Sequence, residues 1–303
     1  MIAALELGLI YGLMALGVYL TFRILDFPDL TVDGSFTTGA AVAAMLVVGG
    51  TNPLLATLAA IAAGLAAGAV TGVLHTKGKI NPLLAGILTQ IALYSINLRI
   101  MGAANLSLLR EDTLLTPLRD GGLMGTAVAV VIFAVVALVF KLLLDWFLHT
   151  DLGLALQATG DNEEMIRSFG VNTDRTKVLG LALSNALVAL CGALIAQYQG
   201  FADIGMGIGL IVAGLASVII GQAIFGTRTI VIATLAVVLG SVVYRVVIQL
   251  ALTIGLDPND MKLISAVLVV IALVLPQWGL FKGLGARLGL RRTHVGAKAK
   301  VDA

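Results

Sequence analysis

Long apolar stretches separated by short polar breaks dominate this chain. A helix needs about 20 apolar residues to cross the hydrocarbon core of a bilayer, and most of these stretches reach that length. A helix-length window finds nine candidates, at residues 2–22, 34–49, 53–74, 81–100, 123–147, 176–199, 207–225, 229–250 and 263–280. The pattern predicts an all-α polytopic membrane protein with eight to ten transmembrane helices.

Two of the stretches depart from a regular span. The stretch at 34–49 is short, and the stretch at 207–225 is crowded by glycines between Gly205 and Gly221. Irregular backbone at membrane depth is tolerated only where protein or a water-filled cavity surrounds it. We therefore expect one or two of the helices to be broken or re-entrant.

Composition agrees with a membrane domain whose helices pack closely. Hydrophobic residues make up 59% of the 303 residues, charged residues 12%, and the mean hydropathy is +1.04. Among the 35 glycines, Gly64, Gly68 and Gly72 recur at a spacing of four and so share one helix face. Small residues in this arrangement let transmembrane helices approach each other, so we interpret the three glycines as a packing seam.

The basic residues suggest an orientation in the membrane. The region 1–281 reads as a single transmembrane domain, and the segment 282–303 reads as a basic tail. Placing this tail in the cytoplasm and alternating backwards puts Lys77 with Lys79 and the segment 149–176 on the same side, and the N-terminus outside. The loop at 99–120, with three arginines, falls outside and runs against the rule.

The segment at about 149–176 is the largest internal polar segment on the predicted cytoplasmic side. Its centre predicts a short amphipathic helix near 157–170 that lies flat under the membrane, with Thr159, Asp161 or Asn162 as its cap. Gly160 and Gly170 are expected to let the chain turn at the two ends. The candidate contact residues are Gly160, Asp161, Asn162, Glu163, Glu164, Arg167 and Gly170. A solvated connector between two spans is the alternative interpretation.

Uncharged polar residues within the spans are candidates for a solute path. Gln90, Tyr94 and Asn97 follow at spacings of four and three, which places them on one helix face. Amides and a phenol can hydrogen-bond a passing solute without trapping it, although hydrogen bonding between packed helices is equally open. Asn185 and Gln222 are further candidates of the same kind.

The chemistry that is missing narrows the function. No phosphate-binding loop, paired intramembrane aspartates or metal-ligand motif is found in the sequence, and Glu6 is taken as the single carboxylate inside an apolar run. A chain of this kind is not expected to be an enzyme or to bind a cofactor, and it differs from ion-driven carriers, which bury ionisable groups near the midplane. Asp33 is expected to cap the helix that follows it.

Three stretches resemble the permease subunits of ABC importers in the branched-chain amino acid and ribose group. They are GLALQATGDNEEMIRSFGVNTDRTKVLGLALSNALVALCGAL from Gly153, GLIYGLMALGVYLTFRILDFPDLTVDGSFTTGA from Gly8, and GMGIGLIVAGLASVIIGQAIFG from Gly205. Within that group the chain is most similar to a subgroup linked to aromatic amino acid uptake. It departs from the pattern at Gln157, where the family commonly has an arginine.

The resemblance implies a function that the residues alone do not give. It implies an importer permease in the bacterial cytoplasmic (inner) membrane that moves a small polar solute, with an amino acid as the first choice. The loop near 157–170 would dock a separate ATPase subunit that uses ATP and Mg, and the other partners would be an extracytoplasmic substrate-binding protein or lipoprotein, a second copy of the permease and membrane lipid, but no nucleic acid. A stand-alone secondary carrier or channel, or an intramembrane enzyme, remains the alternative.

Overall fold

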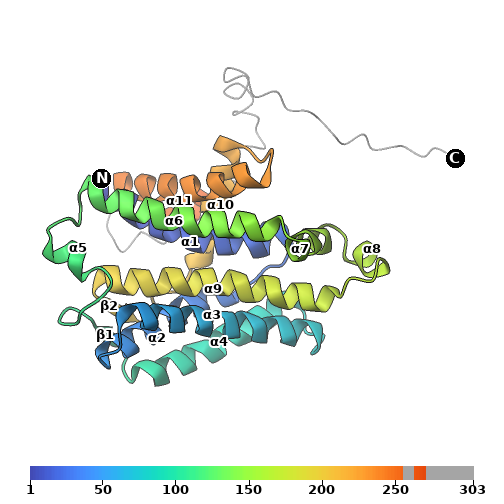
Figure 1. Cartoon of the computed structure of the whole chain (residues 1–303), viewed down its shortest axis with the longest axis horizontal. Helices are drawn as coiled ribbons and strands as arrows, with labels where there is room; N and C mark the ends of the chain where they lie inside the picture. The colour runs from blue at the N-terminus through green and yellow to red at the C-terminus, as the bar shows by residue number, and fades with distance from the viewer. Residues whose placement is uncertain (255–262, 271–303) are drawn as a thin grey trace, which may run out of the picture.

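The computed structural model describes residues 1–254 and 263–270, and nearly all of its regular structure is helical. Seven helices are long and apolar enough to cross a membrane, and they run side by side along the long axis of the molecule (Figure 1). They are α1 (Ile2–Tyr19), continued by the π-helical turn η1 (Leu20–Ile24), α2 (Thr31–Val48), α3 (Pro53–Thr76), α4 (Pro82–Met101), α6 (Ala127–Leu148), α9 (Thr173–Gln199) and α11 (Ile230–Thr253). The all-α polytopic fold expected from the hydropathy pattern is confirmed.

The two remaining predicted spans have different outcomes. The stretch at 207–225 forms a shorter apolar helix, α10 (Leu210–Phe225), which begins at Gly209 in a left-handed conformation. The stretch at 263–280 is helical over 263–270, and its remainder lies outside the described residues, as does the basic tail predicted at 282–303.

The two ends of the bundle carry different small elements (Figure 1). One end holds α5 (Thr116–Asp120) and a two-stranded antiparallel sheet of β1 (Asn105–Ser107) and β2 (Phe201–Asp203). The other end holds α7 (Asp151–Asp161) and α8 (Glu163–Ser168). The loop between α6 and α9 therefore lies at the opposite end from the N-terminus.

Local sequence explains why several helices begin where they do. Asn52 and Asn81 each precede a proline, and each side chain accepts a hydrogen bond from the backbone N–H two residues later. Proline in the first turn needs no hydrogen-bond acceptor for its nitrogen, and an asparagine cap satisfies a neighbouring donor. The two Asn-Pro pairs thus mark the starts of α3 and α4.

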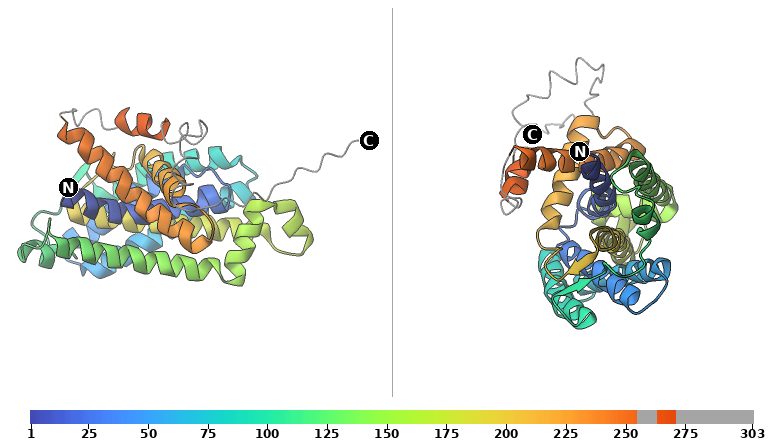
Figure 2. Two further views of the ribbon diagram at one scale, coloured as in Figure 1. Left: turned by 90° about the horizontal axis from the view of Figure 1, so that it is seen from above. Right: turned by 90° about the vertical axis from the view of Figure 1, so that its left-hand side faces the viewer.

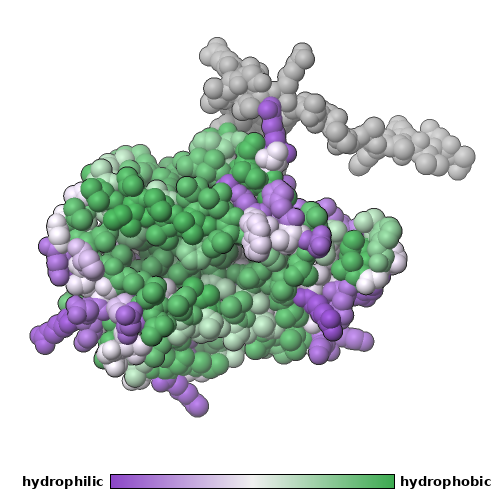
Figure 3. All heavy atoms as spheres, viewed as in Figure 1, coloured by the Kyte–Doolittle hydropathy of each residue, from purple (hydrophilic) through white to green (hydrophobic). Residues whose placement is uncertain are grey.

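The centre of the bundle is made by α1, α2 and α9, with α9 near the middle when the molecule is viewed end-on (Figure 2). Most of α2 and α9 is buried, 78% of the best window of each, against 28% for α4 and α6. A continuous apolar surface covers the flank of the molecule, and hydrophilic side chains gather mainly toward its two ends (Figure 3). This distribution fits a body whose flanks face lipid.

Close packing of α3 against α9 depends on glycine. A Cβ atom on Gly68 would lie 2.2 Å from the carbonyl oxygen of Leu181, and one on Gly64 would lie 2.4 Å from that of Asn185. Gly72 approaches Val178 in the same way. The packing seam inferred from the spacing of the three glycines is confirmed.

Candidate functional site

The polar loop between α6 and α9 folds into two helices: the helix predicted near 157–170 is present as α8 but is shorter than expected, and α7 precedes it. The chain leaves α7 at Asn162, whose backbone is extended, with φ of −158°, and starts again as α8. The Asn162 side chain accepts a 2.9 Å hydrogen bond from the Met165 N–H, so among the three predicted caps Asn162 serves α8. Thr159 is buried inside α7 and donates to Ala155 instead.

The two glycines of this loop have different roles. Gly160 lies within α7, and a Cβ atom there would sit 1.9 Å from the carbonyl oxygen of Ile24. It permits α7 to pack against η1, so its expected role in a turn was wrong. Gly170 has φ of +87° and open space around it, as a turn after α8 requires.

α7 is fixed to the helix that precedes it through Gln157. The Gln157 amide donates a 2.7 Å hydrogen bond to the carbonyl oxygen of Leu148 at the end of α6, and a 3.2 Å bond to Gly153 in its own helix. The Gln157 side chain therefore satisfies a helix-end carbonyl.

Charged side chains fasten α8 to α9. The Glu163 carboxylate lies 2.6 Å from Lys177 of α9 and 2.9 Å from Arg167 of its own helix, and it accepts a hydrogen bond from the Thr173 hydroxyl. Arg167 donates to the same hydroxyl at 2.8 Å and lies 3.6 Å from Asp174. Partial burial alone would raise the pKa of Glu163, but the hydrogen bond and charge of Lys177, with Thr173 and Arg167, hold this pKa below its ordinary value.

A further contact extends this network to α3. The Lys177 ammonium lies 3.4 Å from the Nε2 atom of His75 near the end of α3, and the Nδ1 atom of His75 lies 2.9 Å from the carbonyl oxygen of Ile80. α8, α9 and the end of α3 are thereby connected by side-chain contacts.

The outer side of α8 is left open. Asp161 and Glu164 are exposed, and Met165 and Phe169 show 47% and 74% of their surface. We call these four residues the α8 surface. Two large exposed apolar side chains close to two exposed carboxylates in the sequence, at the polar end of a membrane protein, are typical of a protein-binding surface, because methionine and aromatic residues are enriched in interfaces.

The predicted polar stripe of α4 is divided by the fold. Tyr94 is exposed and Gln90 partly so, but Asn97 is buried and donates a 3.4 Å hydrogen bond to the carbonyl oxygen of Gly34 in α2. Asn97 therefore serves helix packing, which was the alternative interpretation for this stripe. Gln90 and Tyr94 remain candidates for a solute path, as does the partly buried Gln222 of α10.

Asn185 forms a polar link at the centre of the bundle. Its amide donates a 2.7 Å hydrogen bond to the carboxylate of Asp29, which also accepts one from the Thr31 N–H. Asp29 belongs to the connector between η1 and α2, is buried, and lines a cavity of about 160 Å³ beside α10. This hydrogen bond fixes the connector against α9. Asn185 therefore has a structural role, in addition to being a candidate for the solute path.

Asp33 caps a helix other than the one predicted. It lies inside the first turn of α2, and its two carboxylate oxygens accept 2.8 Å hydrogen bonds from the N–H groups of Gly209 and Ile211. α10 begins inside the fold, where free N–H groups need an acceptor other than water. The expectation that Asp33 caps its own helix was wrong, since the distant partner leaves no local signal.

The spans contain more buried charge than the single carboxylate expected from the sequence. Glu6 is fully buried and accepts hydrogen bonds from the Gly125 N–H and the Tyr198 hydroxyl. Lys141 and Asp145 form a buried ion pair within α6, so Glu6 is not the single carboxylate in an apolar run. The signal was present as a lysine and an aspartate four residues apart in the stretch 123–147.

The sequence also gives no sign of a partly buried cation in α11. The guanidinium of Arg245 lies 3.5 Å from the centre of the Tyr11 ring, and this ring stacks on Phe36 of α2 at 6.0 Å. The cation–π contact joins α11 to α1 and, through the ring stack, to α2.

Comparisons with known proteins agree with this architecture. Residues 1–274 match the family described as "Branched-chain amino acid transport system / permease component". The chain is 45% identical to a "Tyrosine transport system permease protein" of Clostridioides difficile (strain R20291), covering 89% of this chain and 88% of that protein. It is 28% identical to the "Ribose import permease protein RbsC" of Escherichia coli (strain K12), covering 76% and 72%.

A solved structure supports the fold. The chain resembles a chain of "PsaBC from Streptococcus pneumoniae in complex with Fab", with a TM-score of 0.52, 17% identity and 89% of each chain covered. With a match along nearly the whole described length and a relative at 45% identity, the chain belongs to the family of permease components of branched-chain amino acid transport systems, and it is the permease of an ABC importer.

Proposed function

We propose that the α8 surface binds a separate ATPase subunit, which uses ATP and Mg, on the cytoplasmic side of the bacterial inner membrane. The observation that carries this proposal is the combination of an exposed Met165 and Phe169 with a helix that is fixed from behind by Glu163 and Lys177. An interface needs exposed anchors, and transmission of force needs a helix that does not move independently of the spans.

The contacts support different roles for different residues of the loop. Asp161, Glu164, Met165 and Phe169 face outward, whereas Glu163 and Arg167 hold α8 on α9. Gly160 and Asn162 shape the join between α7 and α8. When a bound ATPase moves, the network carries the movement as a rigid body into α9 and the end of α3.

The solute proposed for this importer is an aromatic amino acid. The supporting observation is the 45% identity to a permease named for tyrosine transport. In this proposal an extracytoplasmic binding protein or lipoprotein delivers the amino acid, a second copy of the chain completes the pore, and Gln90, Tyr94 and Gln222 line it. Tyr94 is exposed on α4 at the edge of the single chain, where a second copy can reach it.

Recovery of the ATPase from native membranes tests the α8 surface. The variant combines Glu164→Lys with Phe169→Ser, because both side chains are exposed and neither belongs to the Glu163 network. We expect at least a tenfold loss of ATPase recovered with the affinity-purified permease. Glu163 is left unchanged, since its substitution would also loosen α8.

The matched control replaces one carboxylate and one large apolar residue at the opposite end of the bundle. Asp112→Lys with Leu109→Ser alters an exposed carboxylate and an exposed apolar residue there, and ATPase recovery should equal that of the wild type. Equal recovery with the α8 variant would refute the docking surface. Failure to recover an ATPase with the wild type, under conditions that preserve other transporter complexes, would also refute the proposal that this surface holds a separate ATPase subunit.

A further inference from the structure

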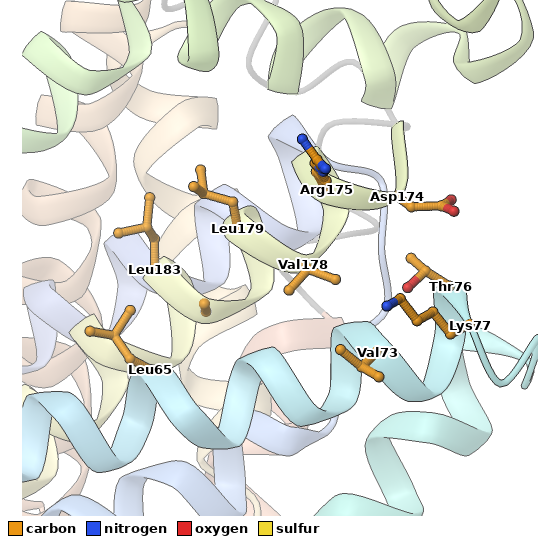
Figure 4. Close-up of a pocket in the computed structure, with 10 residues that line it drawn as sticks. Leu65, Val73, Thr76, Lys77, Asp174, Arg175, Val178, Leu179 and Leu183 are labelled. Carbon is orange, nitrogen blue, oxygen red and sulfur yellow. The ribbon is translucent and has the colours of Figure 1, made fainter. Parts of the chain in front are cut away.

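A groove lies between α3 and α9 at the end of the bundle that carries α7 and α8 (Figure 4). Its volume is about 430 Å³. Leu65, Val178 and Leu183 are among the apolar side chains along its length, and Lys77 and Arg175 lie at its rim. The groove therefore combines an apolar floor with two cations.

The order of these groups follows the length of the helices. Leu65 of α3 and Leu183 of α9 lie deeper in the spans, whereas Lys77 is the C-terminal cap of α3 and Arg175 belongs to the first turn of α9. The cations are exposed and stand where both helices leave the apolar part of the bundle. An apolar groove that ends at a cationic rim is complementary to a phospholipid, whose acyl chain lies in the membrane and whose phosphate lies at the interface.

The charges around the rim are compatible with an anion. In the part of the chain that the structure describes, neither Lys77 nor Arg175 forms an ion pair. Asp174 also lines the groove, but its carboxylate points away from the apolar floor in Figure 4 and lies 3.6 Å from Arg167. The neighbouring Lys177 is occupied by Glu163.

We propose that this groove binds one anionic phospholipid of the cytoplasmic leaflet. Its phosphate contacts Lys77 and Arg175, and part of an acyl chain lies over Leu65, Val178 and Leu183. The choice of leaflet rests on the proposed function, which places α8 in the cytoplasm.

A lipid at this position lies beside the contacts that join α8 to α9 and, in the proposed function, transmit movement from the ATPase. Val178 lines the groove and packs on Gly72 of α3. In the sequence, Val178 directly follows Lys177, the residue whose ion pair with Glu163 joins α9 to α8. The bound acyl chain fills the space between α3 and α9 and braces the two helices that receive movement from α8.

Native mass spectrometry of the full purified chain tests the site, with phosphatidylglycerol and phosphatidylcholine as the probes. The wild type should retain phosphatidylglycerol in preference to phosphatidylcholine. Each basic side chain near a membrane surface is worth roughly a fivefold gain in binding, so Lys77→Gln with Arg175→Gln should weaken phosphatidylglycerol binding by about 25-fold. Arg99→Gln with Arg110→Gln removes two exposed cations at the other end and should leave it unchanged.

A second variant tests the apolar part of the groove independently of its charged rim. Ala182 lines the groove, and Ala182→Phe fills it while keeping both cations. Loss of phosphatidylglycerol from this variant is expected, and retention would overturn the proposal. Equal retention of the two lipids by the wild type, or displacement by an equal concentration of soluble glycerol phosphate, would also overturn it.

The proposal of a lipid site and the proposal of an ATPase-binding surface can be refuted independently of each other. Detergent-purified permease reports lipid binding without the ATPase, and the Lys77 and Arg175 variant should still recover the ATPase in the presence of added phosphatidylglycerol. Loss of lipid retention from the Glu164 and Phe169 variant would show that the groove is not an independent site.

Discussion

At the scale of single residues, the buried pair of Lys141 and Asp145 makes the sharpest prediction. Both side chains are nearly inaccessible, at 4% and 8% exposure, and the Thr234 hydroxyl of α11 donates to Asp145 at 2.6 Å. Asp145→Asn would leave the Lys141 ammonium buried without a counter-charge. We expect a loss of about 3–5 kcal/mol of stability, because breaking one partner of a buried pair exposes the full cost of desolvating the other. Thermal unfolding of the detergent-solubilised chain measures it.

Two further variants make this test specific. Asp151→Asn changes an exposed aspartate at the start of α7 and should leave the unfolding temperature near that of the wild type. Replacing both residues together, with Lys141→Met and Asp145→Leu, should recover most of the stability. Exchanging a buried ion pair for apolar residues of similar volume often leaves the free energy of unfolding unchanged or raises it. An Asp145→Asn protein as stable as the wild type would mean that Lys141 reaches the surface in solution.

Residue-level roles could be predicted from sequence only where the partner is local. Asn162 was among the predicted caps because a cap is satisfied within three residues along the chain. Asp33 and Glu6 find their partners 176 and 119 positions away, at Gly209 and Gly125, and no local pattern encodes such a pairing. Gly160 resembles a turn residue in the sequence, because nothing local shows that η1 packs against it.

At the scale of elements, the glycine seam between α3 and α9 predicts a large effect of one side chain. Gly68→Val would place a Cβ atom 2.2 Å from the backbone oxygen of Leu181, and a backbone atom cannot move aside as a flexible side chain can. We expect a loss of stability at the upper end of the roughly 1–3 kcal/mol that overpacking costs. Ala66→Val, at an exposed position of the same helix, is the control for β-branching in α3. Similar unfolding temperatures for both variants would contradict the packing.

Spans were predictable at this scale because length and hydropathy decide them. The predicted stretches 53–74 and 81–100 agree with α3 and α4 to within two residues, helped by the two Asn-Pro starts. The bounds of the two helices in the polar loop were harder to predict, because Asn162 was one of three possible caps and Gly160, which resembles a break in the sequence, lies inside α7. The short α10 was expected as an irregular span, but its capping by Asp33 depends on contacts between distant elements.

At the scale of the whole molecule, the orientation in the membrane connects both proposals, and it is open to a direct test. α9 has 27 residues, so it is about 40 Å long and exceeds the ~30 Å hydrocarbon core. α8 and the β1–β2 sheet, at its two ends, must then lie on opposite sides of the bilayer. Lys77, Lys79 and Arg175 favour a cytoplasmic position for the α8 end, whereas the arginines of the loop at 99–120 weigh against it.

Cysteine labelling decides between the two orientations. The one natural cysteine, Cys191, is buried, so single cysteines placed at exposed positions should dominate the reaction. A membrane-impermeant maleimide should label Leu109→Cys in intact spheroplasts, and Ser168→Cys only after the membrane is opened. The reverse pattern would place the α8 surface outside the cell, where no ATP-using subunit can reach it, and would assign the lipid groove to the other leaflet. Labelling of each variant after the membrane is opened measures how well its own cysteine reacts, and so serves as the control for labelling efficiency.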